Sequence, residues 1–183
     1  MNNDVKKDLN DSILAFENLV LPIIESKNMI NGNFISIEKI THSFEEDIAT
    51  HFDKLSSIDL FRIKIDEGIS GIASRVQFGK KAYNTFTIRK NRVSGALTEL
   101  DKIIKNYHSG KYFYPHLYIH SYISNRENGE VLSFAIVETK TLIELYEKNI
   151  YNIKINRYDG NEFICFDWND ILKKGYKIKI YSI

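Results

Sequence analysis

The sequence predicts a single α+β domain in which helices flank a mixed or mainly antiparallel sheet. Three observations lead to this prediction. Apolar residues recur every three or four positions near the N-terminus, whereas they alternate with polar residues along much of the later chain. A chain of 183 residues is long enough for one domain and too short for two ordinary ones. With 43% hydrophobic and 27% charged residues, it has the composition of a protein that folds around a core.

Helical periodicity appears in four places. The first predicted helix spans residues 3–27, where these residues share one face: Leu9, Ile13, Phe16, Val20 and Ile24. The second spans 43–55 and begins with a capping box, because Glu46 stands three residues after Ser43. A third helix is expected over 94–108 with Ser94 as its N-cap, and a fourth to about residue 149 with Thr139 as its N-cap. A further short turn is expected at 170–173.

Alternating apolar residues predict the strands between these helices. In chain order they are 34–37, 58–65, 69–78, 83–90, 117–124, 131–137, 152–158, 162–166 and 176–181. Asn128-Gly129 favours a hairpin between two of them. The predicted order is therefore α-β-α-βββ-α-ββ-α-βββ.

Charge is distributed unevenly along the chain although the net charge is only +1. Residues 1–60 carry five Lys/Arg and eleven Asp/Glu, a balance of −6, and residues 61–116 carry eleven and four, a balance of +7. No acidic residue stands between Glu67 and Glu99. A basic segment of this kind attracts phosphates or an acidic protein. The alternative is that it packs against the acidic N-terminal helices.

Several classes of protein are not expected. The sequence has no apolar run of the roughly 18 residues that a membrane span needs, and its N-terminus lacks the pattern of a signal peptide. Cys165 is the single cysteine, which excludes an internal disulfide framework and a cysteine-cluster metal site. No P-loop or dinucleotide fingerprint is present. We therefore expect a cytoplasmic protein with no membrane partner and no organic cofactor.

The middle of the chain carries a resemblance to a known superfamily. A helix at 43–55 precedes strands at 58–65, 69–78 and 83–90, and a helix at 94–108 follows them. Within this order stand Ser57-Ile58-Asp59 and, 18 residues later, Arg75-Val76-Gln77. The segment from about 43 to 137 resembles the core of the PD-(D/E)XK, or restriction-endonuclease-like, superfamily. The segments Thr85–Arg89 and Ser94–Glu99 resemble small proteins of phages and mobile elements.

The resemblance implies a core over about 43–137, preceded by the helix 3–27 and followed by a C-terminal α/β extension over 138–183. It also implies a metal-dependent phosphodiesterase in which Asp59 binds Mg²⁺ or Mn²⁺ and Gln77 takes the place of the second ligand. An acid of the preceding helix would add a further ligand: Glu45, Glu46 or Asp47. Arg75, Lys80 and Arg89 would hold phosphate. Hard ions of this kind prefer such oxygen ligands.

This sequence departs from the superfamily pattern at one position. A lysine is expected two residues after the second ligand, but Gly79 stands there and Lys80 is one residue further on. Either the active residues are rearranged or the fold no longer cuts. Two local interpretations also stay open. Asp59 is equally consistent with a residue that hydrogen-bonds nearby backbone, and Gln77 with an exposed polar residue of a strand.

A second candidate site lies between the strand predicted at 83–90 and the helix that follows it. Arg89, Lys90 and Arg92 lead toward Ser94, and Lys81 lies a few residues earlier. Free N–H groups at a helix start, together with arginines, form an anion site. Two functions follow. One is a nucleic-acid-acting protein with a nuclease-like core. The other is a non-catalytic phage or mobile-element protein that docks on a host nucleic-acid enzyme, where the segment 75–92 binds nucleic acid or an acidic protein.

Overall fold

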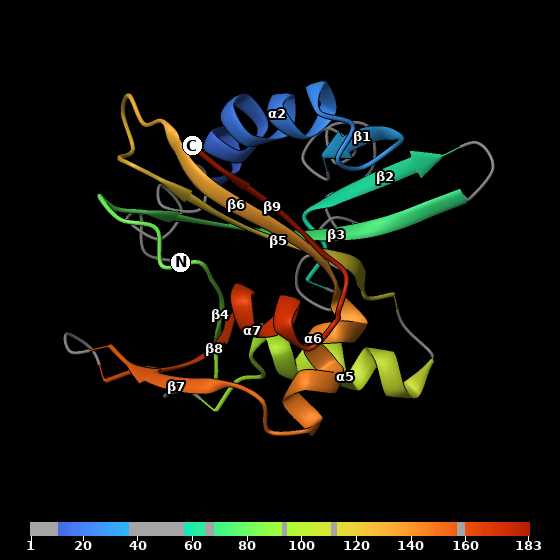
Figure 1. The fold of residues 1–183 in the computed structure, drawn as a ribbon. Coiled ribbons are helices and arrows are strands. Elements are labelled where there is room, and N and C mark those ends of the chain that lie inside the picture. Colours follow the sequence, from blue (N-terminus) through green and yellow to red (C-terminus); the bar gives the residue numbers. More distant parts are fainter. Residues whose placement is uncertain (1–10, 37–56, 65–67, 93–94, 111–112, 157–159) are drawn as a thin grey trace.

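The computed structural model describes residues 11–36, 57–64, 68–92, 95–110, 113–156 and 160–183. They form an α+β domain in which a six-stranded sheet lies between an N-terminal helical segment and a second layer of helices and strands (Figure 1). None of the helices in these ranges is long and apolar enough to cross a membrane.

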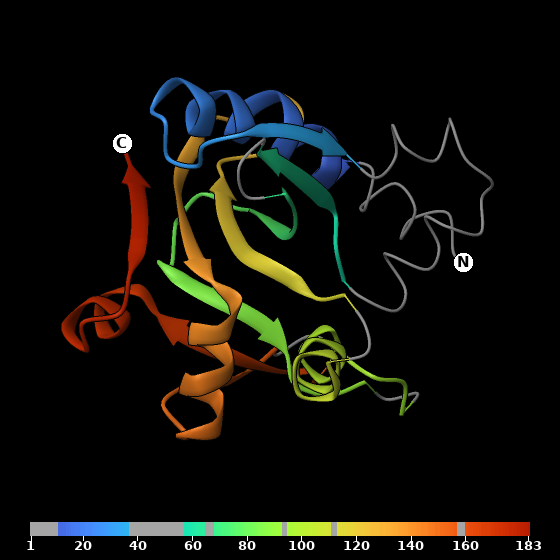
Figure 2. The same ribbon diagram turned by 90° about the vertical axis from the view of Figure 1, so that its right-hand side faces the viewer.

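The N-terminal helical segment covers one face of the large sheet. It runs from residue 11 through a turn of π-helix, η1 (Phe16–Val20), into α2 (Leu21–Ser26). Phe16, Val20 and Ile24 are buried, as the helical spacing predicts. Their partners in this core include Ile72, Ile119 and Phe134 of the sheet. Figure 2 shows the segment lying across the ends of the strands on this side.

The large sheet is mixed. Its strands are, in chain order, β1 (Asn33–Ser36), β2 (Leu60–Lys64), β3 (Gly68–Phe78), β5 (Pro115–Ile123), β6 (Val131–Glu138) and β9 (Ile178–Ser182). They lie side by side in the order β1-β2-β3-β5-β6-β9. β3 and β5 are parallel, and every other neighbouring pair is antiparallel. The hairpin predicted at Asn128-Gly129 joins β5 and β6, so that prediction is confirmed.

A smaller sheet and three helices cover the opposite face. The small sheet has the order β4-β8-β7 and consists of β4 (Thr85–Arg89), β7 (Asn152–Ile155) and β8 (Glu162–Asp167). The helices are α5 (Glu99–Ser109), α6 (Thr139–Glu147) and α7 (Trp168–Lys173). A second apolar core fills the space between these elements and the large sheet. Its largest buried side chains are Phe86, Tyr118, Tyr122, Phe166 and Trp168.

Three sequence predictions need correction. The strand predicted at 83–90 does not continue a meander with β2 and β3, because β4 pairs with β8 of the small sheet. The antiparallel series in the large sheet is instead β1-β2-β3. Helix α5 begins at Glu99 rather than near Ser94, and Thr98 is its N-cap. Thr139 is the first residue of α6, and the N-cap position belongs to Glu138. The helix predicted at 43–55 lies outside the described residues.

Candidate functional site

Asp59 lies where β2 begins, next to the edge of β3. Its backbone N–H donates to the Ile72 carbonyl over 2.9 Å. Its Oδ2 atom accepts a hydrogen bond from the backbone N–H of Ser74 and lies 3.3 Å from the Ser74 Oγ atom. The pairing of β2 with β3 ends at Leu60 and Ile72, so Ser74 has no partner residue on β2. The Asp59 carboxylate accepts the hydrogen bond from the Ser74 N–H instead. Asp59 therefore does hydrogen-bond nearby backbone, and its side chain remains half-buried.

A buried tyrosine lies close to this carboxylate. The Tyr118 hydroxyl donates to Glu99 Oε2 over 3.4 Å. Burial raises the pKa of Tyr118 well above 10.0, the negative charges of Glu99 and Asp59 raise it further, and the positive charge of Arg75 opposes them. The hydroxyl therefore stays protonated at neutral pH. The charges of two carboxylates and one guanidinium group therefore all affect the pKa of the Tyr118 hydroxyl.

Two arginines converge on one aromatic ring beside this group. The guanidinium carbon of Arg75, on β3, lies 5.9 Å from the ring centroid of Phe163. That of Arg89, on β4, lies 5.7 Å from the same centroid. The three residues come from both sheets and are all half-buried. Both guanidinium groups are of a kind that donates charge-assisted hydrogen bonds to an anion such as phosphate.

His120 joins the two sheets from the inside. Its Nδ1 atom accepts a hydrogen bond from the Thr87 N–H over 3.1 Å, and its ring stacks on Tyr122 at 4.9 Å. Burial lowers the pKa of His120 well below 6.5, and Arg75 lowers it further. The ring is therefore neutral at pH 7. Its Nε2 atom has no hydrogen-bond partner among the described residues.

These residues form a group that we call the inter-sheet site: Asp59, Arg75, Arg89, Glu99, Tyr118 and His120. They come from the start of β2, from β3, β4 and β5, and from the first turn of α5. Perturbed pKa values beside charged partners are typical of functional sites, although ion-pair networks also produce them.

The structure does not bring Gln77 to Asp59. Gln77 lies three residues beyond Ser74 on β3, about 10 Å further along the strand, and pairs with Tyr122 of β5. The pairing of Asp59 with Gln77 as ligands of one ion stays a prediction. Glu45, Glu46 and Asp47 lie outside the described residues.

The predicted phosphate-binding residues separate into different surroundings. Lys80 and Lys81 are exposed in the segment after β3, and Arg92 is exposed beyond β4. Lys90 Nζ lies 2.8 Å from Glu162 Oε2, and the hydrogen bond to this carboxylate raises the pKa of Lys90. Lys90 therefore already has an anionic partner within the chain.

The start of α5 does not form the predicted anion site either. Asp101 Oδ2 accepts from the Thr98 N–H over 2.8 Å and from the Thr98 hydroxyl over 2.7 Å. The Asp101 N–H donates back to Thr98 Oγ1 over 3.2 Å. This capping box already places a carboxylate at the helix start, and Glu99 adds a second negative charge to the first turn. Ser94 lies outside the described residues.

Sequence reasoning missed Glu99, Tyr118 and His120. A signal for the helix start was present, because Asp101 follows Thr98 at the capping-box spacing, whereas Leu97 follows Ser94 at that spacing. That start places Glu99 at the first helical position. Tyr118 and His120 alternate on a predicted strand and so share a face, but the sequence does not show that Glu99 and Arg75 face them.

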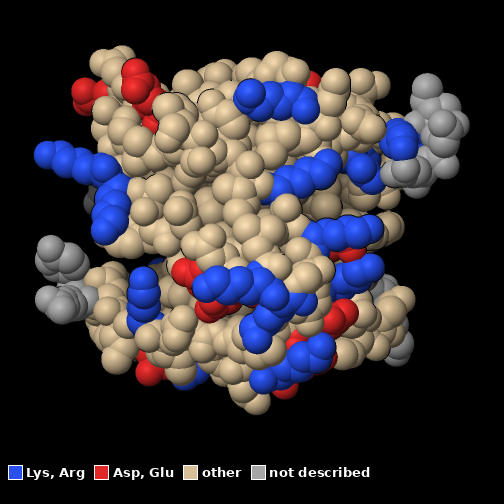
Figure 3. All heavy atoms as spheres, in the orientation of Figure 1, with Lys and Arg blue, Asp and Glu red and all other residues tan. Residues whose placement is uncertain are grey.

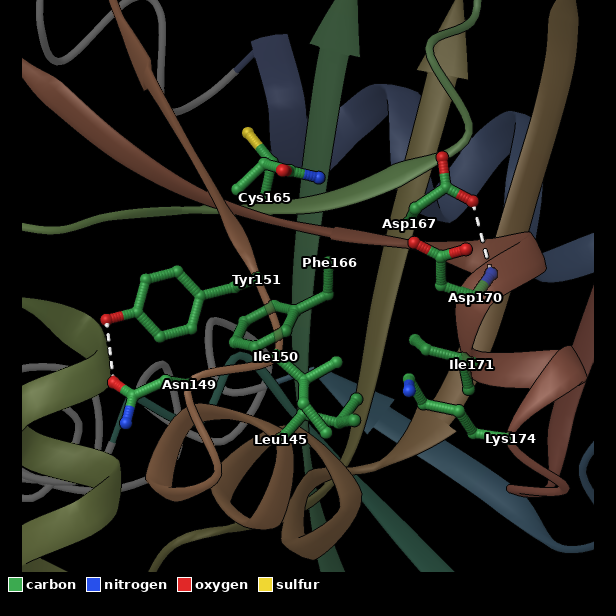
Figure 4. A pocket seen from close by; sticks show the side chains of 11 residues that line it. Leu145, Asn149, Ile150, Tyr151, Cys165, Phe166, Asp167, Asp170, Ile171 and Lys174 are labelled. Atoms are coloured by element: carbon green, nitrogen blue, oxygen red, sulfur yellow. Dashed lines mark hydrogen bonds between the residues drawn. The ribbon is translucent and has the colours of Figure 1, made fainter.

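A pocket of about 400 Å³ lies apart from the inter-sheet site, between α6, α7, β7 and β8. Figure 4 shows apolar side chains on its floor and polar ones around it. The apolar residues are Leu145, Ile150, Phe166 and Ile171. The Cys165 side chain turns away from the pocket (Figure 4), toward Thr87, whose Oγ1 lies 3.8 Å from the sulfur. Burial raises the pKa of the Cys165 thiol, which lowers its reactivity.

Within the ranges that the structure describes, no group of three or more His, Cys, Asp or Glu residues is arranged to hold a metal ion. The two carboxylates of the inter-sheet site are the oxygen donors available there. Comparisons with protein-family models, with curated proteins and with solved structures gave no match.

Proposed function

We propose that the protein acts on nucleic acid as a divalent-metal-dependent phosphodiesterase with a nuclease-like core. The observation that carries this proposal is the contact of the buried Tyr118 hydroxyl with Glu99 Oε2 at 3.4 Å, beside the charges of Arg75 and Asp59, which also act on the pKa of Tyr118. Hydrolysis of a phosphodiester needs anionic oxygen ligands for a metal ion and cationic donors for the phosphate, side by side. The inter-sheet site supplies both kinds of group.

The topology is compatible with the proposal. The N-terminal helical segment, the antiparallel strands β1, β2 and β3, helix α5 and the parallel strand β5 follow one another in the order helix, three strands, helix, strand. The resemblance to the PD-(D/E)XK superfamily implies such an order, and this supports the proposal with β1, β2 and β3 in the place of the three strands; residues 37–56, between β1 and β2, lie outside the described part of the chain. Strand β4 is an excursion between β3 and α5 that brings Arg89 to the site.

The donor set fits Mg²⁺ or Mn²⁺. Magnesium is commonly held by one or two carboxylates and keeps several of its waters, and Asp59 and Glu99 are the carboxylates that we assign to it. The hydrogen bonds from Ser74 orient the Asp59 carboxylate. A bound ion of this kind polarises a phosphoryl oxygen and generates hydroxide near neutral pH.

The chain's own residues have distinct roles in the proposed reaction. Asp59 and Glu99 would hold the metal ion. Arg75 and Arg89 would donate hydrogen bonds to the phosphate oxygens and stabilise the charge that develops on them. His120 is fully buried and would act as a positioning residue, because its bond to the Thr87 N–H ties β4, and with it Arg89, to β5.

The non-catalytic alternative receives less support. It needs the basic residues of the segment 75–92 to share one binding surface. Arg75 and Arg89 instead lie over Phe163 at the junction of the sheets, and Lys90 is paired with Glu162. Arg92, Lys80 and Lys81 remain exposed and are the residues such a surface would use.

The test is a cleavage assay with plasmid, single-stranded DNA and RNA in the presence of Mg²⁺, Mn²⁺ or EDTA. We expect metal-dependent cutting that Asp59→Ala and Glu99→Gln each reduce by about a hundredfold or more. Glu127→Gln, an exposed carboxylate in the β5–β6 hairpin, is the matched control and should cut like the parent. Cutting that persists in Asp59→Ala would refute the assigned site.

A further inference from the structure

A basic groove crosses one end of the large sheet, on the face that carries the N-terminal helical segment. It has a volume of about 530 Å³. Its charged lining residues are Arg62, Lys64, Glu138, Lys177 and Lys179, and its apolar lining includes Leu117 and Ile136. The described lining residues therefore include four cations and one carboxylate.

The register of the sheet explains why these cations gather. Lys64 pairs with Gly68 at the start of β3, and Leu117 at the start of β5 pairs with Glu138 at the end of β6. Val137 in turn pairs with Ile178 at the start of β9. The ends of β2 and β6 and the starts of β3, β5 and β9 therefore lie at the same end of the sheet.

The alternation of the strands turns the cationic side chains to one face. Arg62 and Lys64 follow Leu60 at spacings of two on β2, and Leu60 packs in the core beneath the helical segment. Lys177 and Lys179 precede Tyr181, which packs against the same core. Lys27 lies 5.5 Å from the Tyr181 ring centroid and adds another positive charge beside the groove.

The single carboxylate does little to neutralise the groove. Glu138 Oε2 lies 2.9 Å from Lys140 Nζ, so its charge is already matched by a lysine that does not line the groove. Arg62 donates through Nε to Ser70 Oγ over 3.0 Å, and Lys179 donates to the Met29 carbonyl. The Met29 carbonyl is neutral, so this hydrogen bond leaves the positive charge of Lys179 in place. Figure 3 shows several Lys and Arg side chains on the right-hand side of the molecule, near β2 and the start of β9.

We propose that this basic groove binds the sugar–phosphate backbone of a nucleic acid, away from the inter-sheet site. The inference rests on the proposed function for its choice of polyanion, and it adds a second point of attachment to that function. β2 links the two places, because Asp59 lies at its beginning and Arg62 and Lys64 lie along it. The cations are carried by β2 and by β9 and the residue before it, on either side of β3, β5 and β6 at one end of the sheet. Cations spread along one groove suit a repeating line of phosphates, which are bound through charge and without reading of the base sequence.

The test measures binding without cleavage. Fluorescence anisotropy of labelled single-stranded and duplex oligonucleotides is recorded in EDTA, so that the result does not depend on catalysis. We expect Lys177→Glu/Lys179→Glu to weaken binding about tenfold or more and to reduce the slope of log K against log[salt] by about 1.4 to 1.8. Lys177→Arg/Lys179→Arg should bind like the parent.

The control carries the same change of charge elsewhere. Lys173→Glu/Lys174→Glu alters two exposed lysines at the end of α7, outside the basic groove. Equal weakening by both pairs would overturn the proposal, because it would show a general effect of net charge. A second outcome would also overturn the proposal: the parent binds no nucleic acid but binds polyglutamate, and Lys177→Glu/Lys179→Glu weakens the binding of polyglutamate. The groove would then fit an acidic protein partner.

The two proposals fail separately. Groove-dependent binding in EDTA, together with no cutting under any metal condition, would support the basic groove and contradict the phosphodiesterase. The opposite result is cutting that depends on Asp59 but not on Lys177 or Lys179, with binding unchanged in Lys177→Glu/Lys179→Glu. That result would support the phosphodiesterase and contradict the basic groove.

Discussion

Arg75 and Arg89 lie over the same ring, that of Phe163, although β3 and β4 belong to different sheets. Nothing in their spacing along the sequence predicts this meeting. It results from the pairing of β4 with β8, which places Arg89 opposite Phe163. The two guanidinium groups are thereby held beside one ring at the junction of the sheets.

This arrangement predicts the effect of removing one arginine. Arg89→Gln should weaken oligonucleotide binding in EDTA and reduce cleavage by about tenfold to a thousandfold, because one charged donor to the phosphate is lost. Arg126→Gln is the matched control, since Arg126 lies 4.7 Å from the Phe78 centroid and pairs with Asp11. Equal losses in both variants would mean that Arg89 acts only through net charge.

The buried histidine predicts a pH dependence of stability. Because burial lowers the pKa of His120 in the folded state, the unfolded chain takes up a proton below about pH 6.5 that the folded chain does not. The free energy of unfolding should therefore fall on acidification, with a slope of up to about 1.4 kcal/mol per pH unit for this group. Above about pH 6.5 the group should contribute no pH dependence.

Urea unfolding between about pH 7.5 and 5.5 measures this effect, since most carboxylates stay ionised over that range. His120→Asn should show a smaller slope, because its amide oxygen can accept from the Thr87 N–H without titrating. His116, whose pKa is lowered by burial and by Arg62, should account for part of the remaining slope. An unchanged slope in His120→Asn would contradict the assignment.

Close packing beside Asp59 predicts a coupled pair of substitutions. A Cβ atom on Gly71 would lie 2.7 Å from Ile58 Cδ1 and 2.9 Å from its Cγ1. Gly71→Ala should therefore destabilise the fold by about 1 to 3 kcal/mol. Ile58→Val removes the nearer of these atoms, so Gly71→Ala should cost less in that background. Additive losses in a double-mutant cycle would show that the two residues are not coupled.

The sequence predicted the individual elements better than their assembly. Periodicity located the N-terminal helix, β2, β3, β5 and β6 within a few residues, because each exposes a regular apolar pattern to a core. Periodicity could not show that β4 belongs to the small sheet. Its partner β8 stands more than 70 residues later, and the sequence pattern of a strand does not identify a partner so far away. The position of α5 was missed because Ser94 was preferred to Thr98 as the cap.

The candidate site was predicted in part. Asp59, Arg75 and Arg89 were chosen from the sequence and lie in the inter-sheet site. Gln77 was chosen because it stands near the expected motif position, but the β2–β3 register places Asp59 beside Ser74 instead. The lysines of the basic groove were not recognised, because the two strands that carry them lie far apart in the sequence and are brought to one end of the sheet only by its register.

The most direct test of the central claim is the cleavage of single-stranded DNA by purified protein in Mg²⁺, compared among the parent, Asp59→Ala, Glu99→Gln and the control Glu127→Gln. We predict that the parent and Glu127→Gln cut and that EDTA abolishes the activity. We also predict that both inter-sheet variants lose about a hundredfold or more while they unfold at the parent's temperature within a few degrees. Full activity in folded Asp59→Ala or Glu99→Gln would contradict the account.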